Sequence, residues 1–334
     1  MIPMSSPPLG LRMTNNGDVG LPSEFSVGSD HGDRIKAMLT QSEKAYACAD
    51  YIGRRSEIDN TPIQEVAVDD NKVDSVCREK MCEWSYRVSD HFQTGREIVA
   101  VSFSYLDRFV DKCSCNRSAF KLAAMTTLYM ANKIYGGPHT LTIGALAELS
   151  RGEFEISHIS EMEVVILQTL AWRLHPPIAQ CFIDAFHKYI CIPADGSMSI
   201  AVYRRAMFFA ELSLYDYTFV QRERSLIAIA SLMNAMEGTN NITLDEQDKF
   251  FEAINLKFDL KYTLDMVETV RNRLWYIYSM SAQYKEDDAI AGSAAPNCIR
   301  EETPKKIMLS GHRSSSTRSI SPVSVATNTG PYHH

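Results

Sequence analysis

The chain has 334 residues, of which 45% are hydrophobic and 22% are charged, and it carries a formal net charge of −7 at pH 7. These totals suit a globular protein with two domains of ordinary size and unstructured ends. The negative charge disfavours direct nucleic-acid binding, because phosphates must be neutralised by cations. No stretch is apolar throughout the length that spans a bilayer, and the first residues do not look like a signal peptide. We therefore expect an intracellular protein with no membrane partner, in the nucleus, the cytoplasm or both.

The eight cysteines are not spaced like a metal site. Zinc sites usually contain paired C-x-x-C or Cys/His clusters, whereas Cys113 and Cys115 form a single C-x-C with no second pair. We interpret the cysteines as reduced thiols that pack as small hydrophobic side chains. The sequence also has no glycine-rich phosphate loop and no nucleophile and base at a recognisable spacing. It therefore predicts a non-catalytic protein with no cofactor and no metal.

The N-terminal part is predicted to contain one helix. Residues 1–34 are rich in Pro, Gly, Ser and Asn without a hydrophobic period, which predicts disorder. Apolar residues between Ile35 and Tyr51 fit helical spacing loosely, so we expect a solitary helix there. Residues 60–71 are predicted to be irregular. Residues 35–71 should therefore form an N-terminal helix and a connector.

Residues 72–176 are predicted to form a first block of five helices. An apolar face that begins at Val73 marks the first helix, and Thr94-Gly95-Arg96-Glu97 is a candidate capping box for the second. The third helix is apolar almost all round, which predicts a central, buried position, and it ends at the breaker Gly136-Gly137-Pro138. Pro176-Pro177 ends the block. The five helices are expected at about 73–88, 94–113, 118–135, 143–149 and 157–174.

Residues 177–282 are predicted to form a second block of five helices. Turns that contain Pro, Gly or Asn separate its apolar segments, and strand signals are nearly absent. The fold class is therefore all-α, with two tandem five-helix bundles. Residues 283–334 are rich in Ser, Thr, Pro and Ala, and we expect a disordered, locally basic tail there. The helices of the second block are expected at about 178–190, 198–216, 221–237, 245–256 and 262–280.

Several short pieces between Val73 and Phe186 occur in an order that points to a family. Arg78 stands six residues before Trp84, and Leu122 lies in the expected central helix. The other pieces are Tyr105-Leu106-Asp107-Arg108-Phe109, Ala131-Asn132-Lys133-Ile134 and Met162-Glu163-Val164-Val165-Ile166-Leu167. Together they resemble the cyclin box, the first of the two five-helix folds of cyclins. Two later pieces agree with this: Phe208-Phe209-Ala210-Glu211-Leu212-Ser213-Leu214 is similar to the second cyclin fold, and Trp172-Arg173-Leu174-His175-Pro176-Pro177 to the junction of diatom-type cyclins.

The resemblance implies a partner and a binding surface. Cyclins bind and activate cyclin-dependent Ser/Thr protein kinases without supplying a catalytic group. This chain is therefore expected to form a heterodimer with such a kinase, to control cell-cycle progression, and to meet the kinase's substrates or inhibitors. In the family, the residues that match Lys133 and Glu163 hydrogen-bond the kinase backbone beside its mobile C-helix. An apolar groove for that helix is expected from Met130, Ile134, Leu167, Trp172 and Leu174.

The residues themselves leave other roles open. A lysine at a helix C-terminus is favoured by the helix dipole, so Lys133 could simply cap its helix. Ser160 and Glu163 could form a capping box, which would occupy the Glu163 side chain. Met130 could belong to the core, and so could Leu167. The resemblance favours the binding roles.

Two more sets of residues follow from the resemblance. Arg78 and Asp107 are expected to form a buried, structural ion pair within the cyclin box. Many cyclins also have a docking patch for Arg-x-Leu peptides. In this chain the matching patch contains Lys80, Arg87 and Lys121, which would repel a basic peptide, so we expect that docking mode to be absent or altered. The residues that match the patch are Cys77, Lys80, Met81, Trp84, Arg87 and Lys121.

The tail holds candidate modification sites, and one other function was weighed. Thr303 and Ser321 each precede a proline and are candidate phosphosites for a proline-directed kinase. The alternative function is a cyclin-fold DNA-binding or transcription-associated scaffold. Such a protein would be expected to have a basic second domain and often a zinc ribbon, and this sequence has neither.

Overall fold

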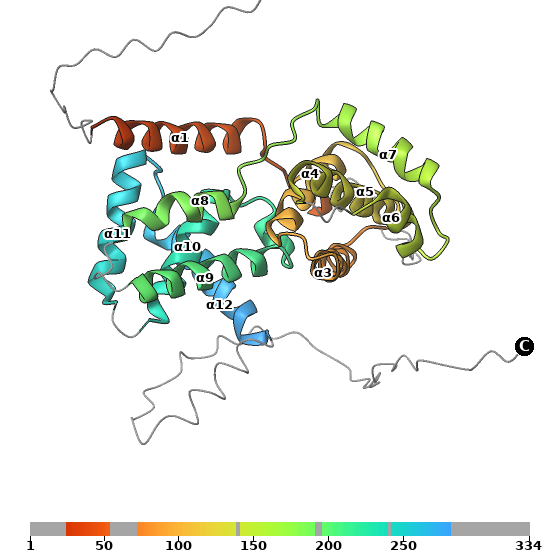
Figure 1. Ribbon diagram of the computed structural model, residues 1–334. Helices are drawn as coiled ribbons and strands as arrows, with labels where there is room; N and C mark the ends of the chain where they lie inside the picture. Colours follow the sequence, from red (N-terminus) through yellow and green to blue (C-terminus); the bar gives the residue numbers. More distant parts are fainter. Residues whose placement is uncertain (1–24, 54–71, 138–140, 191–195, 240–241, 282–334) are drawn as a thin grey trace, which may run out of the picture. The chain divides into compact units, whose positions relative to one another are not determined.

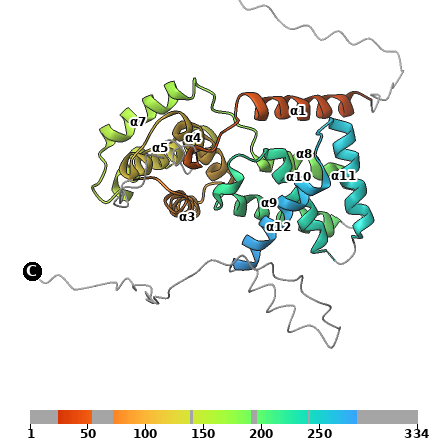
Figure 2. The same ribbon diagram turned by 180° about the vertical axis from the view of Figure 1, so that it is seen from behind.

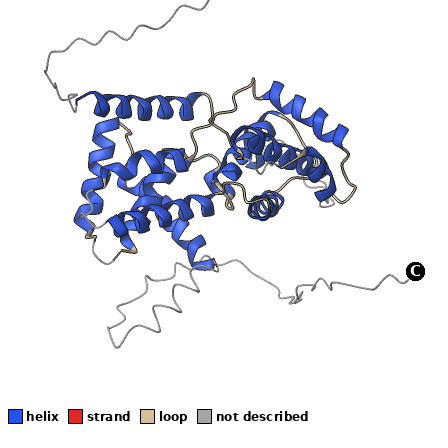
Figure 3. Ribbon diagram, viewed as in Figure 1, coloured by secondary structure: helices blue, strands red, loops and turns tan. Residues whose placement is uncertain are grey.

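The computed structural model describes residues 25–53, 72–137, 141–190, 196–239 and 242–281. In these ranges the regular secondary structure is helical, and no strand is formed (Figure 3). An isolated β-bridge pairs Lys72 with Asn116. The predicted all-α class is confirmed. None of the described helices is both long and apolar enough to cross a membrane.

Helices α3 to α7 form a first bundle (Figure 1). α5 lies at its centre and packs against α3, α4, α6 and α7. Asn116 begins α5, because its side chain accepts a hydrogen bond from the backbone N–H of Ala119, and Gly136 ends the helix. More than half of the residues of α5 are buried, as its apolar sequence predicts. The bounds are α3 (Ser75–His91), α4 (Glu97–Lys112), α5 (Arg117–Tyr135), α6 (Ile143–Leu149) and α7 (Ile156–Thr169).

Helices α8 to α12 form a second bundle around α10. Every residue of α10 from Ser225 to Met236 is buried, and the helix packs against α8, α9, α11 and α12. Thr243 and Glu246 form a capping box at the start of α11, in which each side chain accepts from the other's backbone N–H. The bounds are α8 (Ala179–Phe186), η1 (His187–Tyr189), α9 (Gly196–Ser213), η2 (Tyr217–Phe219), α10 (Arg224–Glu237), α11 (Leu244–Phe258) and α12 (Leu264–Met280).

Helix α1 (Phe25–Lys44) corrects the expected position of the N-terminal helix. It begins before Ile35 and ends before Tyr51. Ile35 is buried in the core of the second bundle, where α1 packs against α8 (Figure 2). Tyr51 is buried in the core of the first bundle instead. The apolar residues between Ile35 and Tyr51 were therefore assigned to one helix although they belong to two segments that pack into different cores.

The start of α4 also differs from the prediction. The N-cap of α4 is Arg96 and makes no side-chain capping bond, so the expected capping box at Thr94 is wrong. The Arg96 side chain instead donates hydrogen bonds to Asp90 and Glu211. Glu211 lies 115 residues further along the chain. The Thr94 hydroxyl donates to the carbonyl O of Ser89 and therefore does not cap α4. A local sequence pattern cannot reveal a partner as distant as Glu211.

Candidate partner-binding surface

An exposed ion pair joins the last turn of α5 to the middle of α7. Lys133 Nζ lies 2.5 Å from Glu163 Oε1, and the two side chains are 52% and 16% exposed. The ammonium also lies 5.0 Å from the ring centroid of Tyr129, one turn earlier in α5. Because α7 begins at Ile156, the alternative in which Ser160 begins the helix is wrong. Both side chains therefore extend from the bodies of their helices and reach the surface.

The apolar residues expected beside this ion pair differ in exposure. Ile134 is 37% exposed and Trp172 is 69% exposed, while Leu167 and Leu174 are half-buried. Met130 is only 1% exposed and packs in the core of the first bundle, so the structure does not place it on the surface. The expected groove therefore lacks Met130. Of its two expected roles, groove or core, the structure gives Met130 the core role, because α5 is largely buried.

Tyr135 holds the end of α5 against the junction that follows α7. Its hydroxyl lies 2.8 Å from Nδ1 of His175 and 3.3 Å from the carbonyl O of Leu174. Its side chain is 41% exposed, so an aromatic ring is present on this surface one residue after Ile134. Sequence reasoning missed this residue. The available signal was an aromatic residue two positions after Lys133 at the end of a buried helix.

Trp172 has a backbone conformation that favours glycine. α7 ends at Thr169 rather than at the expected Leu174, because Ala171 and Trp172 have φ values of 49° and 59°. The backbone N–H of Trp172 donates to the carbonyl O of Leu167 at 3.1 Å, which closes the turn. Left-handed backbone costs a residue other than glycine about 1–2 kcal/mol. Strain of this kind collects at binding sites, where the surrounding structure enforces it.

Two residues of α4 hold the backbone of the same junction. Tyr105 donates its hydroxyl hydrogen to the carbonyl O of Leu174, and Nη2 of Arg108 donates to the carbonyl O of Arg173 at 3.0 Å. The Arg108 guanidinium lies 4.7 Å from the ring centroid of Tyr46, and burial lowers its pKa to about 10. It therefore remains charged at neutral pH. The sequence identified both residues as part of the family motif but assigned them no role.

Arg78 and Asp107 form a bidentate ion pair in the interior. Nε and Nη2 of Arg78 donate to the two Asp107 carboxylate oxygens at 2.8 and 2.9 Å, and both residues are 2% exposed. Nη1 of Arg78 donates to the carbonyl O of Leu214, directly after α9, and the Tyr51 hydroxyl donates to Asp107. Burial opposes the charge of Arg78, but Asp107 outweighs it and raises the arginine's pKa. The pair thus connects α3 and α4 to the second bundle.

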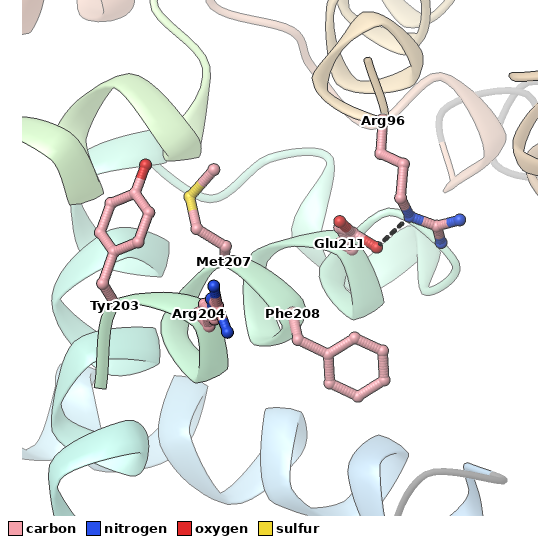
Figure 4. Close-up of a pocket in the computed structure, with 6 residues that line it drawn as sticks. All are labelled: Arg96, Tyr203, Arg204, Met207, Phe208 and Glu211. Atoms are coloured by element: carbon pink, nitrogen blue, oxygen red, sulfur yellow. Dashed lines mark hydrogen bonds and ion pairs between the residues drawn. The ribbon is translucent and has the colours of Figure 1, made fainter. Parts of the chain in front are cut away.

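A second charged contact also connects the bundles, beside a shallow pocket (Figure 4). Nε of Arg96 donates to Glu211 Oε2 at 2.8 Å, and its guanidinium lies 4.5 Å from the ring centroid of Tyr86. Burial raises the pKa of Glu211, although Arg96 opposes the shift. The pocket measures about 430 Å³ and is lined by this ion pair and by Tyr203, Arg204, Met207 and Phe208 of α9.

The residues of the expected docking patch do not share one groove. Met81, Trp84 and Lys121 line a groove of about 420 Å³ together with the start of the α6–α7 loop. The remaining patch residues, Cys77, Lys80 and Arg87, lie outside the lining of this groove. The candidate phosphosites Thr303 and Ser321 lie outside the described residues.

The charges near this groove are more balanced than the sequence suggests. Arg87 pairs with Glu83 of its own helix, and Lys121 pairs with Glu153. Lys80 is exposed and forms no ion pair with the residues that the structure describes. Of the three cations that were expected to repel a basic peptide, Lys80 alone has no acidic partner among the described residues, and it lies outside the groove lining. Arg151, which the expectation did not include, is exposed and lines the groove itself.

Two tandem helical bundles, an ion pair that reaches the surface and an exposed tryptophan define a helical protein with a surface suited to a protein partner. Residues 48–175 match the family model of the cyclin N-terminal domain, and residues 177–286 match that of the cyclin C-terminal domain. The two matches together cover most of the chain. The chain belongs to the cyclin family.

The chain is also similar to individual cyclins. It is 25% identical over 196 residues to G2/mitotic-specific cyclin-B2 of Rana japonica, which covers 57% of this chain and 48% of that protein. It is 23% identical over 256 residues to Cyclin-D3-1 of Arabidopsis thaliana, covering 74% and 68% of the two chains. The match thus spans about half of the frog protein. A viral cyclin from herpesvirus saimiri has the same fold, with a TM-score of 0.51 and 19% identity over 63% of this chain and 89% of that one.

Proposed function

We propose that this chain is the regulatory subunit of a cyclin-dependent Ser/Thr protein kinase, which it binds and activates to control cell-cycle progression. The observation that carries the proposal is the exposed Lys133–Glu163 ion pair beside exposed apolar residues. A charged pair next to exposed apolar side chains suits a partner that offers both backbone hydrogen bonds and an apolar helix face.

The ion pair retains hydrogen-bonding capacity for a partner. A lysine ammonium has three donors and a carboxylate has about four acceptor sites, so the bond between Lys133 and Glu163 leaves most of them unused. The pair can therefore stay intact while Lys133 donates to backbone carbonyls of the kinase and Glu163 accepts from a backbone N–H. Such charge-assisted bonds are stronger than neutral ones and fix the orientation of the partner.

Trp172 is the proposed apolar anchor of this interface. Its side chain is 69% exposed, and the turn that presents it is held by Tyr105 and Arg108 through the neighbouring carbonyls. A preorganised aromatic side chain loses little conformational entropy on binding, and tryptophan is enriched among the residues that dominate binding energy. Ile134 and Tyr135 extend the apolar area at the end of α5.

The proposed mechanism is a shift in the kinase's conformational equilibrium. The chain would supply no reacting group and need no cofactor. By binding the active position of the kinase C-helix more tightly than the inactive one, it would favour the Lys–Glu pair within the kinase that phosphoryl transfer requires. We place the complex in the nucleus, the cytoplasm or both, with no membrane and no direct nucleic-acid partner.

The test is co-purification and kinase activation by variants of the ion pair. Lys133→Ala and Glu163→Ala should each weaken kinase binding by about tenfold or more, because each leaves one charged group without its partner in the interface. Lys249→Ala is the matched control, since it breaks an exposed pair with Asp245 of the same 2.5 Å length on α11. It should bind and activate like the unaltered chain. Full kinase binding by both ion-pair variants would overturn the proposed interface.

A further inference from the structure

Helix α7 leaves much of its apolar surface uncovered. Its buried residues are Ile159 and Ile166, whereas Ile156, Val164 and Val165 are 50%, 52% and 46% exposed. Single exposed apolar residues are common, but three on one helix of 14 residues leave apolar surface uncovered on more than one side of the helix. The helix lies at the edge of the first bundle in both views, with α4, α5 and α6 packed on its inner side (Figures 1 and 2).

α7 has two partly exposed flanks that face in different directions. Successive residues are rotated by about 100° around a helix axis, so residues three or four apart share a flank. Glu163 and Leu167 share the flank that faces Lys133. Val165 is rotated by about 200° from Glu163, so it lies on nearly the opposite side. Met162, three residues before Val165, shares the Val165 flank and is rotated by about 100° from Glu163.

The second flank borders a groove that the proposed kinase surface does not use. This groove measures about 370 Å³. Its apolar residues are Leu122 of α5, Phe154 of the α6–α7 loop, and Met162 and Val165 of α7. Phe154 is buried, whereas Leu122 and Met162 are half-buried, so a partner's side chain could reach both of them. The polar residues of the lining are Glu153, His158 and Glu161.

The charges around the groove are mainly negative. Glu153 pairs with Lys121, whose ammonium lies 5.9 Å from the ring centroid of Phe154. Glu161 is exposed and makes no ion pair with any residue that the structure describes. Residues 156–169 include no lysine and no arginine, so α7 itself offers no cation to balance Glu161. An apolar floor with an uncompensated carboxylate at its edge is complementary to an apolar side chain beside a cation.

We propose that this groove binds a short segment of a partner protein in which a leucine, methionine or phenylalanine stands next to a lysine or arginine. The apolar side chain would pack between Met162 and Val165, and the cation would pair with Glu161. Because Val165 and Glu163 lie on nearly opposite sides of α7, the segment and the kinase can bind at the same time. The groove is defined by its own residues, so this inference does not depend on the proposed kinase surface.

The test is a selection of short random phage-displayed peptides on the full chain, followed by fluorescence anisotropy with the enriched peptides. We expect Lys or Arg to be enriched beside Leu, Met or Phe. Val165→Asp should weaken these peptides by about tenfold or more, because it places a charge on the apolar floor. Glu161→Lys should weaken them more strongly at low salt than at high salt.

Val164→Asp is the matched control. It makes the same change on the same helix at a similarly exposed position, but Val164 does not line the groove. This variant should keep the affinity of the unaltered chain, and all three variants should keep its melting temperature. Equal binding to the unaltered chain and to Val165→Asp, or enrichment of acidic peptides, would overturn the proposal. Binding lost in Trp84→Ala but kept in Val165→Asp would place the peptides in the neighbouring groove and would also overturn it.

Discussion

Substitutions of Trp172 should separate the effect of its backbone from the effect of its side chain. At φ 59°, an alanine keeps the left-handed strain and a glycine removes it. The strain amounts to about 1–2 kcal/mol, and the greater freedom of glycine in the unfolded chain offsets about 0.5–1 kcal/mol of this gain. We therefore expect Trp172→Gly to be more stable than Trp172→Ala by about 0.5–1 kcal/mol, or about 1–4 °C in melting temperature.

Both substitutions should weaken kinase binding equally, because both remove the indole. A tryptophan buries about 150–250 Å² in an interface. Since 69% of Trp172 is exposed, roughly 100–170 Å² remains for a partner to cover. At about 25 cal/mol per Å², this area corresponds to about 2.5–4 kcal/mol, which is roughly a 70- to 1,000-fold increase in Kd.

The two effects are measured by thermal unfolding and by titration calorimetry with the co-purified kinase. Leu256→Ala is the control for removal of an exposed apolar side chain, because Leu256 of α11 is 87% exposed and lies in the second bundle. It should leave the Kd unchanged. A glycine variant no more stable than the alanine variant would refute the argument about backbone strain. An unaltered Kd in either variant would refute the role of Trp172 as an anchor.

Two further predictions concern the buried ion pair and the loss of stability at low pH. Asp107→Ala leaves Arg78 buried without its carboxylate and should lower the free energy of unfolding by about 3–5 kcal/mol, while the double substitution Arg78→Met with Asp107→Leu should recover much of that loss in urea unfolding. A single variant as stable as the unaltered chain would show that the pair is dispensable. The hydrogen bond from the backbone N–H of Cys77 lowers the pKa of Asp74, the N-cap residue of α3. The contribution of Asp74 to the free energy of unfolding is therefore present above its ordinary pKa of 3.8 and is lost as the pH falls below that value. Asp74→Asn keeps a capping oxygen and should make unfolding less pH-dependent between about pH 4 and pH 2, and an unchanged pH dependence there would contradict this assignment.

The helices could be predicted because their determinants are local. α6 spans Ile143–Leu149 as expected, and α5 ends where Gly136 was expected to end it. The order of the family motifs also placed Lys133 and Glu163 on two helices, and the structure brings their side chains together. The helix bounds rest on a signal contained in a few neighbouring residues, such as a breaker or a helical period, whereas the Lys133–Glu163 pair came from the order of the family motifs.

The missing details depended on contacts that a helical period does not encode. The expected start of α4 was wrong because the Thr94 hydroxyl donates to the carbonyl O of Ser89 in α3 instead of capping α4. Met130 and Tyr135 stand on the same helix with similar apolar character, and only packing decides that the first is buried while the second is exposed. A helix that is apolar almost all round gives no periodic signal for its exposed positions, so the sequence could not rank these two residues.

One turn of α4 connects the core of the protein to the proposed binding surface. Asp107 turns inward to Arg78, which donates in turn to the carbonyl O of Leu214 in the segment between α9 and α10. Tyr105 and Arg108, within three residues along the same helix, bond the carbonyls of the junction that carries Trp172. The motif Tyr105-Leu106-Asp107-Arg108-Phe109 therefore need not touch the kinase to be required for the proposed kinase binding. A change in this turn would displace the junction and the second bundle together, because rigid packing passes a shift of one helix to each of its partners.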